Sequence, residues 1–183
     1  TGGDDYPACV LLAELEGNTK FHIERIEEIY EKLNALGLRK GNGLQFLSHI
    51  LALSEEDVNS KTKRCIDIFN RLSNNGIKIR TEYYIALGLI TLLSIKSDEI
   101  INDFIELSLY INKLKKYKWL GKGMNVLMAS GIITRAKVDS LKGVSNEMLE
   151  MSIGITFETI ISAQIAASIA AISTTSVVVT SAN

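Results

Sequence analysis

The sequence feature that most restricts the fold is a series of apolar residues at helical spacing, in a chain that almost lacks proline. Pro7 is the only proline, so long helices can continue without interruption. Intervals of seven, four and three separate the apolar residues of one segment: Val58, Cys65, Phe69 and Leu72. These intervals put the four side chains on one face of a helix. Residues 74–76 (Asn-Asn-Gly) then favour the left-handed conformation in which helices end.

Similar segments recur along the chain in pairs. They predict three helical hairpins, over residues 5–37, 42–76 and 81–116, followed by closing helices over 119–135 and 145–173. Leu53-Ser54 returns as Leu93-Ser94, and paired helices with a period of about forty residues are typical of an α-solenoid. Antiparallel helices of coincidentally equal length are the alternative, and would form an irregular helical bundle. We therefore expect one all-α domain over residues 1–183, in which the nearly all-apolar segment 84–93 is central and buried.

Two local patterns give finer predictions. A helix that starts near Thr19 is expected to bury a single stripe, made of Ile23, Ile26, Tyr30, Leu33 and Leu36. Residues 54–57 (Ser-Glu-Glu-Asp) have the form of a capping box, whose hydroxyl and carboxylate satisfy free backbone N–H groups of a first helical turn. The next helix is therefore expected to be capped from Ser54.

The last predicted helix is long, rich in alanine and uncharged from Thr159 onward. A membrane span is one interpretation of this run. Ser, Thr and Gln side chains within it, and the absence of basic anchors after it, argue against a span. A packed helix that closes the domain, or that contacts a second copy in a homo-oligomer, is favoured.

Composition indicates a soluble globular protein. Apolar residues make up 46% of the chain and charged residues 22%, and the net charge is −1. No overall field therefore selects nucleic acid or an anionic membrane. Cys9 and Cys65 lie in apolar stripes, which favours buried free thiols over a disulfide or a metal pair. Residues 1–5 are neither basic nor apolar, so no signal peptide is indicated and a cytoplasmic location is expected. The absence of an initiator methionine is expected of a fragment.

Sequence motifs for catalysis are missing from the chain. It has no nucleophile elbow, phosphate-binding glycine loop, dinucleotide fingerprint or Cys-x-x-Cys pair. Di-iron bundles need Glu-x-x-His, but Thr19 and Phe46 stand three residues before His22 and His49. Ser48 and His49 are adjacent in a helix, so they point apart and cannot form a dyad. We expect no catalytic residue, metal or cofactor, and His49 and Gln45 are candidate groove residues only.

Basic residues follow the second helix of each predicted hairpin. The set comprises Arg39 and Lys40, then Lys78 and Arg80, then Lys115, Lys116 and Lys118. These charges complement the negative ends of the helices and need no ligand. In a regular stack, however, they would form a basic rim for an anionic partner. Tyr117 and Trp119 lie among the last lysines, an arrangement suited to stacking on nucleic-acid bases, although Trp119 could instead anchor the turn.

Two blocks of the sequence resemble a bacterial protein family known only as a domain of unknown function. They are residues 4–8 (Asp-Asp-Tyr-Pro-Ala) with Leu11-Leu12-Ala13, and residues 41–53 (GNGLQFLSHILAL). The resemblance implies a cytoplasmic protein, mostly from Gram-positive bacteria and about twice as long, with this chain as its C-terminal part. It implies no activity, because none is assigned to the family.

The sequence favours a binding or scaffolding module with a protein partner, because solenoid-like stacks offer a concave groove. The alternative is part of an enzyme whose active site is completed by upstream residues or by a partner chain. A buried polar pocket around His49 with several titratable neighbours would favour the enzyme. A groove without such a cluster would favour the binding module. Nucleic acid and membrane surfaces are the less favoured partners.

Overall fold

The computed structural model describes residues 19–94 and 98–137, and within these ranges all regular structure is helical. The α-helices are α2 (Thr19–Ala35), α3 (Asn42–Ala52), α4 (Val58–Asn74), α5 (Tyr84–Leu93), α6 (Glu99–Lys113) and α7 (Gly121–Lys137). Two short 3-10 helices, η2 (Thr81–Tyr83) and η3 (Lys115–Leu120), precede α5 and α7. The all-α prediction is thus confirmed for these residues. The first helix of the hairpin predicted over 5–37 and the closing helix predicted over 145–173 lie outside them, as does Cys9.

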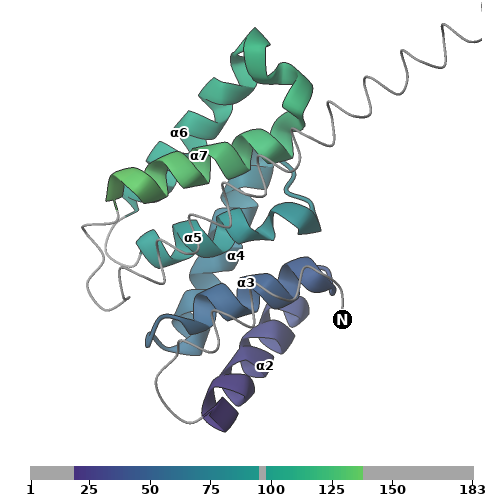
Figure 1. The fold of residues 1–183 in the computed structure, drawn as a ribbon, viewed down its shortest axis with the longest axis vertical. Helices are drawn as coiled ribbons and strands as arrows, with labels where there is room; N and C mark the ends of the chain where they lie inside the picture. The colour runs from purple at the N-terminus through teal and green to yellow at the C-terminus, as the bar shows by residue number, and fades with distance from the viewer. Residues whose placement is uncertain (1–18, 95–97, 138–183) are drawn as a thin grey trace, which may run out of the picture.

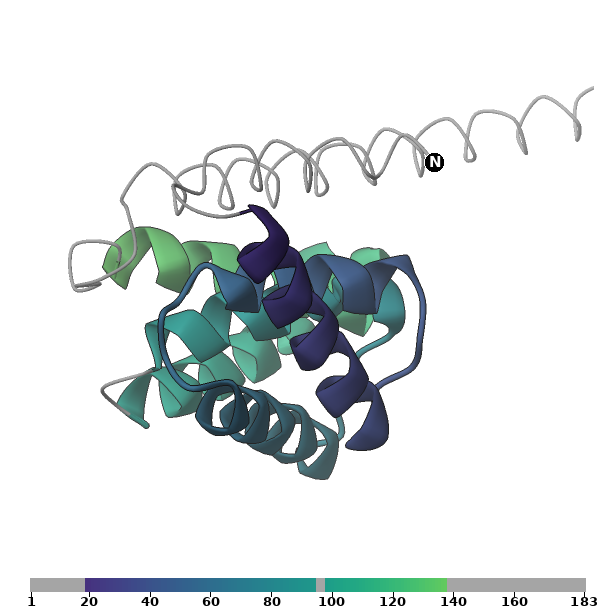
Figure 2. The same cartoon turned by 90° about the horizontal axis from the view of Figure 1, so that it is seen from below.

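Three helices form a row along the long axis of the described structure. α3 packs on α5, and α5 packs on α7. Figure 1 shows the three running in the same direction, from the right of the view to the left, one above the other. α4 lies behind this row in Figure 1. In Figure 2, which views the molecule from below, α4 is seen nearly end-on at the lower edge. The loops that enter α3, α5 and α7 therefore lie along one edge of the molecule.

The strongest packing joins neighbouring predicted hairpins. α2 packs on α3, α4 on α5, and α6 on α7, whereas α3 and α4 make little direct contact although a short loop connects them. Because α5 packs more extensively on α3 and α7 than on α4, the packing does not divide these helices into regular pairs. A solenoid with a regular forty-residue repeat stays a prediction.

Helix α5 is the centre of the core, as its composition predicts. All ten residues from Tyr84 to Leu93 are buried. Helices α3, α4 and α7 pack around it, so no side of α5 needs polar residues. Gly88 lies where α5 meets α3, and a methyl group there would be 2.9 Å from Ile50 Cγ2. This close approach of two helices depends on glycine.

The buried stripe of α2 differs from the prediction. Ile26 and Leu33 are buried as expected, and Ile29 completes the stripe between them. Leu36 and Ile23 are exposed instead. Leu36 follows the last residue of the helix, so helical spacing no longer sets its direction. Intervals of three and four residues from Ile26 define the true contact face.

The cap of α4 also differs from the prediction. Asp57, not Ser54, is the N-cap, and its Oδ2 accepts a hydrogen bond of 2.9 Å from the Ser60 N–H. Ser54 Oγ accepts from the Glu56 N–H at 3.1 Å and so shapes the turn before the helix. The predicted capping box began three residues too early. Ser54, which forms a hydrogen bond within the loop, and Asp57, which caps the helix, are close in sequence, and both residue types occur in turns and at caps.

Candidate functional site

The predicted groove residues Gln45 and His49 lie one turn apart on α3. His49 is buried and Gln45 is exposed, with 3.3 Å between Gln45 Nε2 and His49 Nε2. Ser48 donates to the Leu44 carbonyl of its own helix at 2.9 Å. In residues 19–94 and 98–137, no three His, Cys, Asp or Glu side chains gather as metal ligands would. These residues therefore supply no cluster of such groups around His49.

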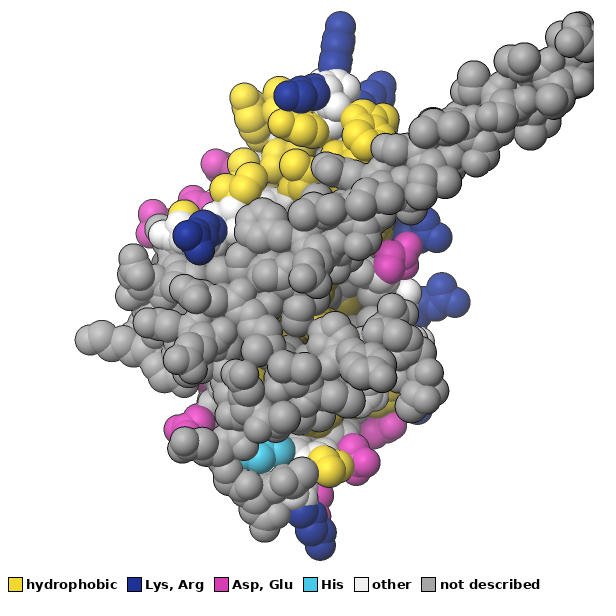
Figure 3. Space-filling view, in the orientation of Figure 1, with side chains coloured by type: hydrophobic (Ala, Val, Ile, Leu, Met, Phe, Trp, Pro, Cys, Tyr) yellow, Lys and Arg dark blue, Asp and Glu magenta, His cyan; other side chains and the backbone are white. Residues whose placement is uncertain are grey.

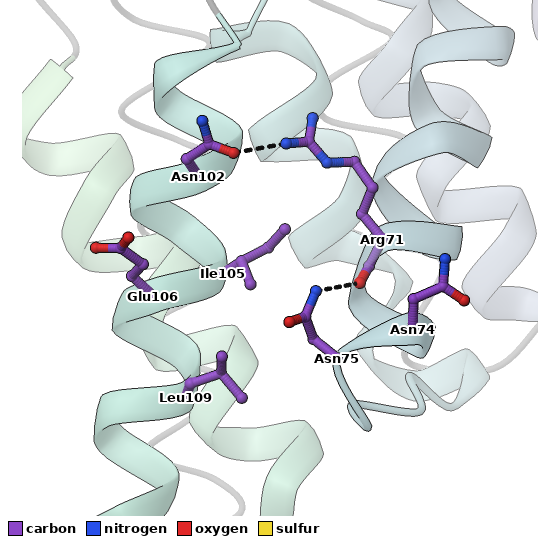
Figure 4. Close-up of a pocket in the computed structure, with 7 residues that line it drawn as sticks. All are labelled: Arg71, Asn74, Asn75, Asn102, Ile105, Glu106 and Leu109. Atoms are coloured by element: carbon purple, nitrogen blue, oxygen red, sulfur yellow. Dashed lines mark hydrogen bonds between the residues drawn. The ribbon is translucent and has the colours of Figure 1, made fainter.

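A recess lies instead between the end of α4 and the middle of α6. Its volume is about 440 Å³, and it is open to solvent. Figure 4 shows its lining: Arg71, Asn74 and Asn75 from α4 and its C-cap, and Asn102, Ile105, Glu106 and Leu109 from α6. We call this recess the α4–α6 groove.

The groove exists because α4 ends there and α6 packs elsewhere. Asn75 caps α4, and Gly76 takes a left-handed φ of 75° that turns the chain away. The Ile77 N–H then donates to the Leu72 carbonyl at 2.9 Å, which closes the helix end. α4 packs mainly on α5 and α2, and α6 packs mainly on α7. The sides of α4 and α6 that face each other therefore stay apart.

One hydrogen bond crosses the groove from wall to wall. Arg71 Nη2 donates to Asn102 Oδ1 at 2.6 Å, and Figure 4 places this bridge at one end, with Leu109 toward the other. Asn75 Nδ2 donates to the Arg71 carbonyl at 2.8 Å. Arg71 Nη1 also lies 3.7 Å from Asp67 Oδ2 on its own helix. The guanidinium is therefore held in place by both walls.

The other lining groups leave hydrogen-bonding capacity unused. The Asn74 amide and the Glu106 carboxylate form no hydrogen bond or ion pair with another described residue. Ile105 is buried and Leu109 half-buried, so an apolar strip lies between these polar groups. Such a combination of an apolar base and a few polar groups is typical of binding sites.

None of the seven lining residues was predicted to be functional. The sequence signal that was available, Asn-Asn-Gly at 74–76, marks the end of a helix and nothing more. Asn102 and Glu106 follow the helical period of an exposed face, which most often means simple solvation. Only the placement of α6 beside α4 brings the two sets together.

A second polar arrangement, also missed from sequence, surrounds the buried Lys61. Its side chain has 0% exposure, and Nζ donates to the Leu51 carbonyl at 2.8 Å and to the Ser54 carbonyl at 2.6 Å. The ammonium thus satisfies carbonyls at the C-terminal end of α3, where a helix lacks its own donors.

Two arginines complete this arrangement around the loop after α3. Arg25 on α2 donates to the carbonyls of Ser54 and Glu56, each at 2.7 Å. Arg64 on α4 pairs with the Glu56 carboxylate through both terminal nitrogens, and its Nε donates to the Thr91 carbonyl at 3.0 Å. The arrangement joins four helices, and we interpret it as structural because protein carbonyls and one carboxylate accept the hydrogen bonds of Lys61, Arg64 and Arg25 Nη2. Arg25 Nε is buried without a hydrogen-bond partner among the described residues.

Burial of Lys61 predicts an unusual pH dependence of stability. Loss of hydration lowers the pKa of Lys61 from 10.5 to about 8. Between these values the unfolded chain binds more protons at this residue, so the free energy of unfolding rises with pH, by at most about 1.4 kcal/mol per pH unit. Urea titrations from pH 7.5 to 10.5 should show this rise in the native protein relative to Lys61→Met.

The comparison with Lys61→Met is necessary because the titration of another buried group changes the stability in the opposite direction. Burial raises the pKa of the free thiol of Cys65 to about 12, so its contribution to stability falls with pH in the same range. Both proteins carry Cys65, and the difference between them removes it. A pH-independent difference would show that Lys61 titrates normally.

The first residues of the predicted basic rim lie in the loops before α3 and η2, and the last three lie in η3. The Arg39 N–H donates to Tyr84 Oη at 3.2 Å, and Lys122 Nζ donates to the Gly76 carbonyl at 3.3 Å. The first contact joins the loop before α3 to the start of α5, and the second joins the start of α7 to the loop before η2. Lys40 lies 3.5 Å from Glu31, and Arg80 lies 3.2 Å from Glu82, so two of the rim charges have acidic partners.

The last part of the predicted rim differs from the rest. Lys115, Lys116 and Lys118 are exposed on η3 and form no ion pair with another described residue. Trp119 keeps 62% of its surface exposed, so most of its ring is not used to anchor the turn. Tyr117 is half-buried, with Lys116 Nζ 5.7 Å from its ring centre. Use of the rim as a binding surface stays a prediction.

The described residues therefore define an all-helical protein with an open groove between two of its helices. The chain belongs to the family described as "Protein of unknown function (DUF4003)", whose family model matches residues 1–166. This finding confirms the resemblance to an uncharacterised bacterial family.

A curated relative supports the same assignment. The chain is similar to "Uncharacterized protein YeaA" of Bacillus subtilis (strain 168), with 31% identity over 176 residues. The match includes 94% of this chain and 50% of the relative, so the chain spans about half the length of that protein. No solved structure matches the chain.

Proposed function

We propose that this chain is a protein-binding module that takes an extended peptide segment of a partner into the α4–α6 groove. The observation that carries the proposal is the apolar strip of Ile105 and Leu109 between two walls whose outer residues, Asn74 and Glu106, have polar groups without a described partner. Stacked helices commonly offer elongated surfaces of this kind to peptides.

The chemistry of the walls fits a peptide main chain. An asparagine amide presents one acceptor and two donors, which complement the N–H and C=O groups of an extended segment. Asn74 offers all of these groups, and Asn102 still offers its amino group because its Oδ1 is occupied by Arg71. Glu106 would attract a basic side chain or accept a peptide N–H.

The dimensions and the base of the groove suit a short segment. A volume of about 440 Å³ falls within the range of roughly 300–1,000 Å³ that small-ligand sites occupy. Leu109 is half-buried, so an apolar side chain of the peptide would cover it and gain burial. We expect a peptide with one apolar anchor beside a basic residue.

A random-peptide display library selected on the folded chain tests the proposal. Peptides that bind should lose about tenfold or more in affinity for Asn74→Ala/Glu106→Ala, since two hydrogen bonds, one of them to a charge, contribute more than about 1.4 kcal/mol. Fluorescence anisotropy of labelled peptides measures the affinities.

The matched control is Asn70→Ala, because Asn70 is exposed on α4 but does not line the groove. It should change affinity by less than about twofold, within the effect of an ordinary surface substitution. The proposal fails if no peptide is enriched, or if the selected peptides bind the groove variant as well as the native chain.

A further inference from the structure

A basic and aromatic tip at one end of the molecule is separate from the α4–α6 groove. Four lysines precede Trp119 within six residues of the sequence, where the chain turns from α6 through η3: Lys113, Lys115, Lys116 and Lys118. We call these five residues, together with Tyr110, the basic tip. Figure 1 places the turn at the upper end of the molecule, and Figure 3 shows apolar atoms and lysines side by side there.

The charge of this region is of one sign. From Leu107 to Lys137 the sequence contains no Asp or Glu, although the whole chain has a net charge of −1. The four tip lysines are exposed and form no ion pair with another described residue. The basic charge is therefore available to a partner, and it is concentrated at one end.

The 3-10 geometry of η3 determines which side chains point outward. With three residues per turn, Leu114, Tyr117 and Leu120 fall on one face, and Tyr117 and Leu120 pack against the core. Lys115, Lys116, Lys118 and Trp119 occupy the two remaining faces and are exposed. These core contacts hold η3 in place, and Trp119 is exposed together with the lysines.

The exposed aromatic rings of the basic tip are evidence independent of its charge. Trp119 is 62% exposed and Tyr110 is 60% exposed, the two largest exposed fractions among the large apolar side chains that the structure describes. Amphipathic Trp and Tyr rings favour the headgroup level of membranes, and lysines place their ammonium groups beside lipid phosphates while their stems cover apolar surface.

We propose that the basic tip binds the surface of a membrane that contains anionic phospholipid. The site is a protruding turn whose basic residues are all lysines, and it has one exposed indole. A protein that binds single-stranded nucleic acid instead needs a groove and several stacking platforms, and arginine is the better bidentate phosphate ligand. A flat anionic surface fits the tip better. None of the described helices has the length and apolar character to cross a bilayer.

Trp119 reports directly on this binding, because it is the only tryptophan in the chain. Vesicles of equimolar phosphatidylglycerol and phosphatidylcholine should shift its emission to shorter wavelength and protect it from acrylamide. Vesicles of phosphatidylcholine alone should do neither. High salt should weaken the response, since the lysines act at the surface through screened charges.

Charge reversal gives the quantitative test. Each lysine near an anionic surface contributes about a fivefold gain in binding, so Lys115→Glu/Lys116→Glu should lose at least about tenfold in vesicle co-sedimentation. The control Lys20→Glu/Lys63→Glu changes the net charge equally at exposed sites on α2 and α4, and should bind nearly as the native chain does. Circular dichroism checks that both variants fold.

Three outcomes would overturn the proposal. The first is an unchanged Trp119 spectrum with anionic vesicles at low salt. The second is an equal loss of binding in both double variants, which would show a general effect of net charge. The third is a Trp119 response to a single-stranded oligonucleotide without one to vesicles, which would assign the tip to nucleic acid. None of these results depends on peptide binding in the α4–α6 groove.

Discussion

Replacement of Lys61 with alanine is expected to lower the free energy of unfolding by about 3–5 kcal/mol. Truncation of a fully buried long side chain costs about 2–5 kcal/mol through lost packing and a cavity. The buried carbonyl of Leu51 also loses its charged donor, and an unsatisfied buried group adds to the loss. The Ser54 carbonyl keeps its bond from Arg25, which limits the total.

The matched control is Lys63→Ala, two residues away on the same helix. Lys63 is exposed, so its loss should cost less than about 0.5 kcal/mol. Urea denaturation followed by circular dichroism measures both values. Equal effects of the two substitutions would mean that water, and not the end of α3, satisfies the Lys61 ammonium.

Substitution of Gly88 should have the next largest effect. Gly88→Leu places a large side chain between α5 and α3, where Ile50 and Leu47 are already fully buried. Overpacking of a dense core costs about 1–3 kcal/mol for a few added atoms and more for a whole side chain, so this variant should lose about 3 kcal/mol or more. Asn70→Leu, on the exposed face of α4, is the control and should be nearly neutral.

A double-mutant cycle tests the same contact, because the effect of Gly88→Ala on stability is expected to change when Ile50 is shortened. In the native background, the methyl group of Gly88→Ala would lie 2.9 Å from Ile50 Cγ2, and the strain should exceed the gain of about 1 kcal/mol in helix propensity. In an Ile50→Ala background that atom is absent, and only Leu47 Cδ1 at 3.1 Å and the Cβ of residue 50 at 3.2 Å remain close, so Gly88→Ala should lose most of its cost or become stabilising. Thermal unfolding of the four proteins checks this, and strictly additive effects would contradict the close approach.

The family and most of the helices could be predicted because their signals are local. Helical spacing in residues 58–72, followed by Asn-Asn-Gly, predicts α4 and its end within a few residues. An all-apolar segment of ten residues can only be stable when surrounded, and α5 is buried at every position. The block at 41–53 carries the family resemblance, which the family match confirms.

Errors arose where a pattern has two equivalent interpretations. Ser54 and Asp57 are both good caps, and sequence alone does not say which of them meets the Ser60 N–H. Ile23 follows the same helical interval as Ile26, yet α2 leaves it exposed. The intervals define a face of the helix, but the partner helices decide how much of that face is covered.

The helical class, the positions of most described helices and the family follow from the sequence, since each depends on residues that are close in the chain. Which helices are neighbours depends on the tertiary structure. It buried Lys61 against the end of α3, and it brought Asn102 and Glu106 opposite Asn74. Hydrogen bonds between different helices have no local signal, because a charged or amide side chain on a helix looks the same in sequence whether it faces water or another helix.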